Sequence, residues 1–132
     1  MNLASIRIIT ADVDRLVGFY ETLTGVSARR LAPVFAEIVT ASGTLAIGDV
    51  ATVALFGEGS AHPADNRSVI VEFRVDDVDA EYDRLTGHLD EVVQVPTTMP
   101  WGNRSLLVRD PDGNLVNLFT PVTADALARQ DH

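Results

Sequence analysis

The stretch PWGNRSLLVRDPDGNLVNLF, residues 100–119, carries the clearest pattern in the chain. Two apolar runs, RSLLV and NLVNLF, flank the polar segment RDPDG, and Asp-Gly is a favoured pair for the tight turn of a β-hairpin. The stretch therefore predicts two strands joined by a turn. They would form the C-terminal end of the folded core.

A strand followed by a helix is predicted twice before this hairpin. LASIRIIT, residues 3–10, predicts a strand, and DVDRLVGFYETLTG, residues 12–25, predicts an amphipathic helix that Asp12 caps and Gly25 ends. SVIVEFRV and DVDAEYDRLTGHL, from residue 68 to residue 89, repeat this order, with Asp77 as the cap. Placing Asp12 on Asp77 aligns the two halves, which indicates an internal duplication.

Further apolar runs complete each half. Runs at 35–40, 45–48 and 50–56 predict three strands after the first helix, and a run at 92–96 predicts one before the hairpin. The fold class is therefore α+β, with two βαβββ modules in a single domain. The modules span 3–57 and 68–121, with a linker at 58–67 and a tail at 122–132. Because a helix covers one face of each sheet, we expect the other faces to form a cupped mixed sheet around a cavity.

Composition limits the partners that we expect. The chain has 132 residues, 46% of them hydrophobic, and no apolar run near the ~20 residues of a membrane span. The absence of cysteine excludes thiolate metal ligands, and the N-terminus lacks the pattern of a signal peptide, so we expect a cytoplasmic protein. A net charge of −9 disfavours nucleic acid, and we expect neither nucleic acid nor membrane as a partner.

The hairpin, the opening strand with DVDRLVGFYETLTG and the duplicated order together resemble the vicinal oxygen chelate superfamily. This superfamily includes glyoxalase I, extradiol dioxygenases and bleomycin-resistance proteins. The resemblance extends from about Leu3 to Pro121. It implies a homodimer, often with exchanged modules, and in many members a divalent metal ion that chelates two neighbouring oxygens of a substrate.

The positions that supply metal ligands in the family carry other residues here. The resemblance places them at Ser5, Ala54, Ile70 and Asn117. Isoleucine and alanine offer no donor atom, and a neutral amide and a hydroxyl are poor ligands for a divalent ion. A register slip of one residue brings no histidine or carboxylate to either opening strand. We therefore expect no metal and no other cofactor.

Strand alternation predicts which other residues face the cavity. Arg7 shares a face with Ser5, and Glu72 shares a face with Ile70, at matching places of the repeat. The two charged residues are interpreted either as ligand anchors or as a structural ion pair, and Glu72 is also a possible general base. Trp101 is interpreted as a cap over planar ligands or as a core or interface residue. Phe35 and Asn103 are further candidates for ligand binding.

Two hypotheses for the function follow. The first is a metal-free protein that binds and sequesters a small molecule, such as a planar or aromatic natural product. The second is an enzyme, of lyase, isomerase or dioxygenase type, that uses acid/base chemistry without a metal or a divalent metal site not recognised in the sequence. A scaffold that binds a protein partner is a third, weaker hypothesis.

Overall fold

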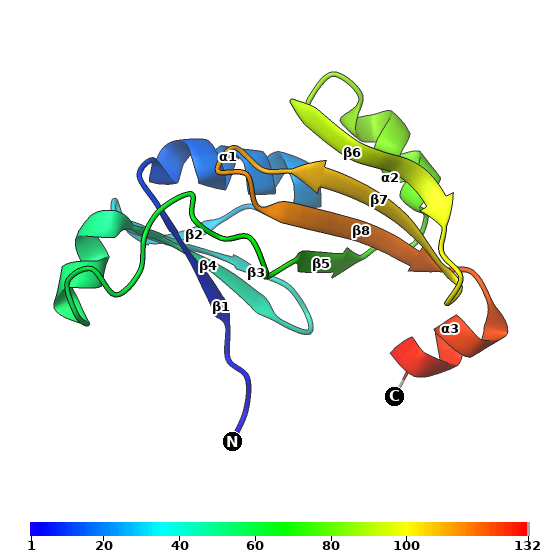
Figure 1. Ribbon diagram of the computed structural model, residues 1–132, viewed down its shortest axis with the longest axis horizontal. Helices are drawn as coiled ribbons and strands as arrows, with labels where there is room; N and C mark the ends of the chain where they lie inside the picture. Colours follow the sequence, from blue (N-terminus) through cyan, green and yellow to red (C-terminus); the bar gives the residue numbers. More distant parts are fainter. Residues whose placement is uncertain (132) are drawn as a thin grey trace. The chain divides into compact units, whose positions relative to one another are not determined.

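The structure is a computed structural model that describes residues 1–131. Its chain divides into two compact units, Met1–Asn66 and a second unit from Arg67 onward. Each unit holds one four-stranded mixed sheet and a helix that packs on it (Figure 1). The α+β class and the two βαβββ-like modules are thereby confirmed, as two separate four-stranded sheets. The predicted cupped arrangement of the two sheets around a cavity stays a prediction.

The first unit has one strand, a helix, three further strands and a short 3-10 helix. These are β1 (Ile6–Thr10), α1 (Val13–Thr24), β2 (Arg29–Ala32), β3 (Phe35–Val39), β4 (Thr44–Asp49) and η1 (Val50–Leu55). The strand order is β1-β4-β3-β2, with β1 parallel to β4 and the other pairs antiparallel. Asp12 caps α1 by accepting a hydrogen bond from the backbone N–H of Arg15, and Gly25 ends it at a φ of 70°. The predicted first helix and its caps are thus confirmed.

The predicted strand at 50–56 is wrong. Those residues form η1, because the Asp49 carboxylate accepts a hydrogen bond from the backbone N–H of Ala51 at 2.8 Å and turns the chain at the end of β4. Ala54 therefore lies on η1 and is exposed, so it does not match Asn117. The missing strand is β2, whose sequence RRLA is charged and mostly exposed at the sheet edge and so lacks an apolar pattern.

The second unit repeats the order of the first and adds a helix. Its elements are β5 (Val71–Arg74), α2 (Val78–Leu85), β6 (Glu91–Thr98), β7 (Asn103–Arg109), β8 (Leu115–Pro121) and α3 (Ala124–Gln130). The strand order is β5-β8-β7-β6, with β5 parallel to β8. No helix or strand occurs between Gly57 and Ile70, which includes the predicted linker.

The predicted hairpin of β7 and β8 is confirmed, and one buried carboxylate organises its turn. Asp110 accepts hydrogen bonds from the backbone N–H groups of Asp112 and Asn114 and from the side-chain amide of Asn114. Gly113 completes the turn at a φ of 82°, a conformation that favours glycine. The turn fixes the register that places Asn117 beside Leu107.

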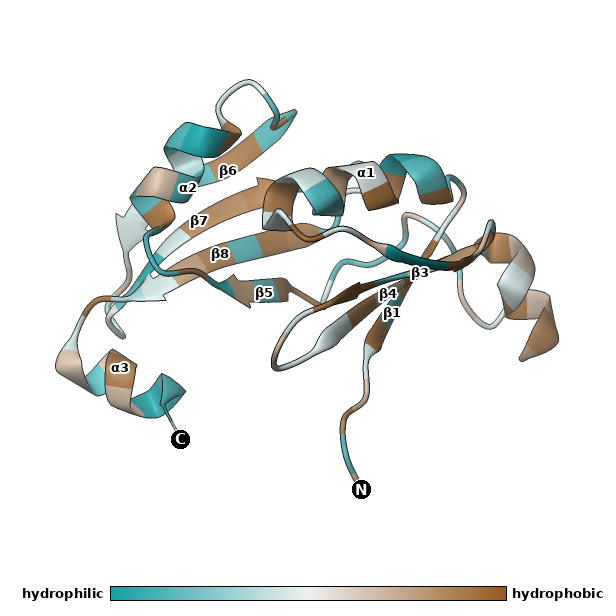
Figure 2. Cartoon of the chain, turned by 180° about the vertical axis from the view of Figure 1, so that it is seen from behind, coloured by the Kyte–Doolittle hydropathy of each residue, from teal (hydrophilic) through white to brown (hydrophobic). Residues whose placement is uncertain are grey.

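The core of the second unit lies between its sheet and α2. Alternate residues of β7 and β8 are fully buried together with residues of α2, and these are Leu106, Val108, Val116, Leu118, Val78 and Leu85. α2 lies behind this sheet in Figure 1 and in front of it in Figure 2, where the strands beneath it are largely hydrophobic. The residues between these core positions therefore face away from α2, on what we call the open face.

The predicted tail forms α3, capped by Thr123, with Ala126 fully buried. Asp131 pairs with Arg74 at 3.0 Å, which holds the end of α3 beside β5. His132, the last residue of the predicted tail, lies outside the described residues. Among the described residues, no helix is long and apolar enough to cross a membrane.

Candidate functional site

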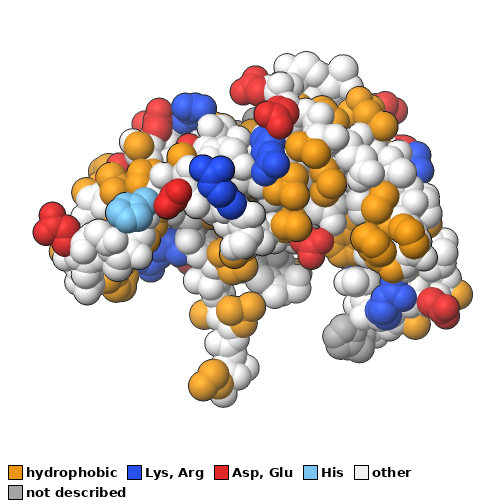
Figure 3. All heavy atoms as spheres, viewed as in Figure 1, with side chains coloured by type: hydrophobic (Ala, Val, Ile, Leu, Met, Phe, Trp, Pro, Cys, Tyr) orange, Lys and Arg blue, Asp and Glu red, His pale blue; other side chains and the backbone are white. Residues whose placement is uncertain are grey.

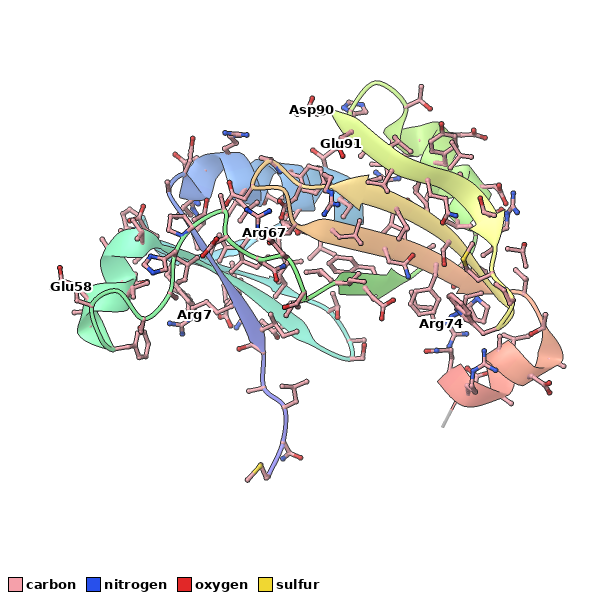
Figure 4. The ribbon with its side chains drawn as sticks, viewed as in Figure 1. Arg7, Glu58, Arg67, Arg74, Asp90 and Glu91 are labelled. Carbon is pink, nitrogen blue, oxygen red and sulfur yellow. The ribbon has the colours of Figure 1, made fainter. Side chains whose placement is uncertain are left out.

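In the first sheet the alternate residues Ala36, Ile38, Leu45 and Ile47 are buried, and the residues between them face the other way, on the open face of this sheet. One arginine on that face contacts two aromatic rings. The Arg7 guanidinium carbon lies 4.9 Å from the centre of the Phe35 ring and 5.0 Å from that of the Phe56 ring. A Cβ added to Gly48 would lie 3.6 Å from Cδ of Arg7. The arginine stem thus passes over Gly48, within van der Waals contact of an added Cβ. Figure 4 shows Arg7 on the η1 side of β1.

The strand register identifies the residues beside Arg7. Ala46 of β4 lies directly opposite Arg7, and Glu37 of β3 lies on the far side of Ala46. Ala46, and not Ala54, is therefore the first-unit counterpart of Asn117. Ser5 precedes β1 and is exposed. Of the predicted first-unit residues, the structure brings together Arg7 and Phe35, while Ser5 precedes β1 and Ala54 lies on η1.

A carboxylate and an amide form a pair on the open face of the second sheet. Glu72 of β5 lies opposite Asn117 of β8, and Asn117 Nδ2 donates a hydrogen bond to Glu72 Oε2 at 2.8 Å. Asn117 is only 9% exposed, whereas Glu72 is exposed to solvent. The pair thus has one anchored member and one accessible member. The structure brings these two predicted residues together.

Several buried oxygens on this face have no hydrogen-bond partner among the described residues. They are Oδ1 of Asn117, Oε1 of Gln94 and Oδ1 of Asn103. Leu107 of β7 pairs with Gln94 of β6 on one side and with Asn117 of β8 on the other. The three side chains therefore lie on the same face of the sheet. Leaving a buried acceptor unpaired costs about 1–3 kcal/mol. A ligand that donates N–H or O–H groups would recover part of this cost.

The other predicted residues of the second unit take no part in the Glu72–Asn117 hydrogen bond. Ile70 precedes β5 and is 47% exposed. Trp101 lies in the turn between β6 and β7 and is 57% exposed, and its backbone carbonyl accepts a hydrogen bond from Arg129 of α3. Asn103 begins β7, four residues from Leu107 along the strand.

Arg104, next to Asn103, is held by α2. It donates hydrogen bonds to both carboxylate oxygens of Asp79, at 2.9 and 3.0 Å. The hydrogen bonds from Arg104 lower the pKa of Asp79, and those to Asp79 raise the pKa of Arg104. Arg104 is therefore engaged in fixing α2 to β7.

The donors at the family's ligand positions do not fit a divalent metal ion. Ser5 offers a hydroxyl, Asn117 offers a neutral amide, and neither Ile70 nor Ala46 offers a donor. Glu72 contributes one carboxylate, to which Asn117 already donates. Within residues 1–131 there is no group of three or more His, Asp or Glu side chains that could hold a metal.

The sequence interpretation missed Phe56, Gln94 and Ala46. Phe56 belongs to the predicted strand at 50–56, which does not form. The same wrong strand led to Ala54, instead of Ala46, as the counterpart of Asn117. Gln94 lies in a strand with two register shifts, at Val92/Gln94 and Gln94/Thr97, so simple alternation did not identify its face. Asp49, whose side chain caps η1, was the available signal that the run at 50–56 begins as a helix.

Comparisons with known proteins agree with this fold. A glyoxalase/bleomycin resistance protein/dioxygenase from Nocardioides is 22% identical, with a TM-score of 0.76, over 94% of this chain and 85% of that chain. A family enzyme of the same description from Burkholderia phytofirmans PsJN is 17% identical, with a TM-score of 0.81, over 92% of this chain and 100% of that chain. A structure described as a conserved domain protein is 27% identical, with a TM-score of 0.72, over 92% and 99% of the two chains.

The comparison with curated proteins gives no match. Residues 2–118 match the family model described as Glyoxalase/Bleomycin resistance protein/Dioxygenase superfamily. This match covers most of the chain, from before β1 into β8, as the resemblance of the hairpin and the opening strand predicted. The chain therefore belongs to the glyoxalase/bleomycin resistance protein/dioxygenase superfamily.

Proposed function

We propose that this chain binds a small planar or aromatic molecule without a metal ion, and that Glu72 and Asn117 hold hydrogen-bond donors of that molecule. The observation that carries the proposal is the Glu72–Asn117 pair. Asn117 of this pair stands at the position of a family metal ligand. Its Oδ1 is buried and has no hydrogen-bond partner among the described residues. An anionic acceptor beside a neutral acceptor suits a ligand with N–H groups, and above all a cationic one.

Two further features support binding of an apolar ring beside these polar groups. Leu107 lies opposite Asn117 on the same face, and Phe119 lies two residues further along β8. Figure 3 shows the second sheet from the side away from α2, with hydrophobic side chains over β7 and β8. Apolar surface with a few directed polar groups is typical of small-molecule sites. The net charge of −9 would also attract a basic compound.

The test uses benzamidine, a planar aromatic cation with N–H donors, and benzyl alcohol as its uncharged counterpart. Isothermal titration calorimetry with and without a chelator would measure affinity for the wild-type chain and for Glu72→Gln. Loss of a charged hydrogen bond should weaken benzamidine binding about 10-fold or more. Glu58→Gln is the matched control, because it removes one exposed carboxylate that lies beside η1 in the first unit, away from Glu72 in the sequence (Figure 4).

Each outcome separates the hypotheses. Equal benzamidine affinity for Glu72→Gln and Glu58→Gln would contradict the proposal. Loss of binding on chelation would show that a metal takes part, in favour of a metalloenzyme. An affinity unchanged in Glu72→Gln, together with loss of a catalysed reaction, would make Glu72 the general base of an enzyme. A homodimer, which the resemblance implies, is a separate proposal, and sedimentation equilibrium would test it.

A further inference from the structure

We propose that the first module contains an oxyanion site centred on Arg7, and that it accepts the carboxylate of an aromatic acid. The proposal goes beyond the proposed function, because the Arg7 site binds an acidic ligand of its own within the first unit. It is carried by residues of the first unit alone, and it uses none of the residues assigned above to the amide–carboxylate pair.

The first observation is that the charge of Arg7 has no protein counter-ion. None of the ion pairs found among residues 1–131 includes Arg7. Glu37 is the nearest acidic residue in the cross-strand row, but Ala46 separates it from Arg7 and the two form no ion pair. In a chain with nineteen acidic residues, an arginine left unpaired on an open sheet face is available to an external anion.

The second observation is that Arg7 is held in place by groups that do not use its hydrogen bonds. The guanidinium lies over the faces of Phe35 and Phe56, and cation–π contact of this kind leaves the N–H groups at the edge of the plane free. A guanidinium fixed in this way can donate two parallel hydrogen bonds to a planar carboxylate. The rings thus reduce the entropy lost when an anion binds.

The third observation concerns how the site is exposed. Phe56 follows η1 and is 74% exposed, although a ring of this size is usually buried. Its ring therefore contacts Arg7 while keeping apolar area open to solvent. An aromatic acid would place its carboxylate on Arg7 and its ring against this area. Gly48 leaves room beside this site, since an added Cβ would lie 3.2 Å from Oγ1 of Thr52 and would push that side chain back slightly.

The experiment is a titration of the ¹⁵N-labelled full chain with benzoate, followed by NMR of the arginine Nε–Hε signals, with benzyl alcohol as the uncharged match. Wild type should bind benzoate with a shift of the Arg7 signal. Arg7→Gln should lower the affinity for benzoate at least about 10-fold, because a bidentate charged contact is lost. Arg29→Gln, which removes an equal charge three strands away on the same sheet, should change the affinity less than twofold.

Phe56→Ala provides a second variant that does not threaten the core, because Phe56 is exposed. It should lower the affinity for benzoate severalfold. It should also broaden the Arg7 Nε–Hε signal, because the Phe56 ring no longer holds the guanidinium in place. No binding of benzoate to wild type, or equal weakening by Arg7→Gln and Arg29→Gln, would overturn the anion site. Such a failure would leave the benzamidine experiment untouched, because that experiment depends on Glu72.

Discussion

At the scale of single residues, one amide changes the chemistry of the family's ligand position. Asn117 donates a hydrogen bond to Glu72, where a glutamate at 117 would place a second carboxylate against the first. Two facing carboxylates are favourable only when a cation or a proton lies between them. The asparagine therefore makes the pair stable without a metal ion.

The first prediction follows from that pairing. Asn117→Asp should lower the free energy of unfolding by about 1 kcal/mol at pH 7, because it places two carboxylates at hydrogen-bond distance, and solvent at Glu72 limits the repulsion. The deficit should shrink as the pH falls towards about 4, where one carboxyl of the pair can be protonated. Urea denaturation at the two pH values measures it.

A double variant controls for other effects of that change. Glu72→Gln combined with Asn117→Asp restores one carboxylate and one amide with their places exchanged. It should recover most of the lost stability at pH 7. If the double variant is as unstable as Asn117→Asp, the loss comes from packing, and the electrostatic account of the pair is contradicted.

At the scale of elements, the turn between β6 and β7 is locked against the start of α3. Val122 donates its backbone N–H to the carbonyl of Gly102, and Arg129 reaches the carbonyl of Trp101. A Cβ added to Gly102 would lie 2.1 Å from Oγ1 of Thr123, the cap of α3, and Gly102 has a φ of 92°. The turn that carries Trp101 thus depends on glycine for both space and conformation.

The second prediction compares two glycines with similar backbone angles. Gly102→Ala should destabilise the chain by about 3 kcal/mol or more, through backbone strain and a collision with the Thr123 cap. Gly113→Ala, at a φ of 82° with no atom within 4 Å of the added Cβ, should cost only about 1 kcal/mol. Thermal unfolding of both variants measures the two losses of stability. Equal losses would show that the collision with the Thr123 cap of α3 does not contribute.

The third prediction concerns the attachment of α2 to β7. Because Arg104 holds the pKa of Asp79 below its ordinary value, the contribution of this pair to stability is present above that value and is lost as the pH falls through the lowered pKa. Arg104→Gln should therefore unfold at a lower temperature than wild type at pH 7, and the gap should close in acid. In NMR titration, the pKa of Asp79 should be higher in Arg104→Gln than in wild type. A pKa unchanged by the substitution would contradict the assignment.

At the scale of the whole molecule, the sequence predicted the architecture because the duplicated signals are local. The Asp12 and Asp77 caps, the first helix and the Asp-Gly turn each act within a few residues and lie where the patterns placed them, whereas the second helix ends at Leu85, four residues before the predicted end. The pairing of Glu72 with Asn117 joins residues 45 apart in the chain. The family resemblance and strand alternation together predicted that both face the cavity, but only the register of β5 on β8 and the hydrogen bond show that they touch.

The remaining features depend on contacts that no local pattern encodes. The end of β4 is set by one side-chain cap at Asp49, and without it the apolar run at 50–56 is indistinguishable from a strand. The position of Phe56 over Arg7 follows from η1 and therefore could not be predicted once η1 was missed. The edge strand β2 is polar because it is exposed, so its pattern is that of a loop.

We propose that this member of the superfamily binds its ligand without a divalent metal ion at the position of Asn117. The most direct test is isothermal titration calorimetry of Mn²⁺, Ni²⁺ and Zn²⁺ into chelator-treated protein. We expect no stoichiometric binding, because one carboxylate and an amide cannot offset the dehydration of such an ion. Binding of one ion per chain with a dissociation constant below about 1 μM, lost in both Glu72→Gln and Asn117→Leu, would contradict the account.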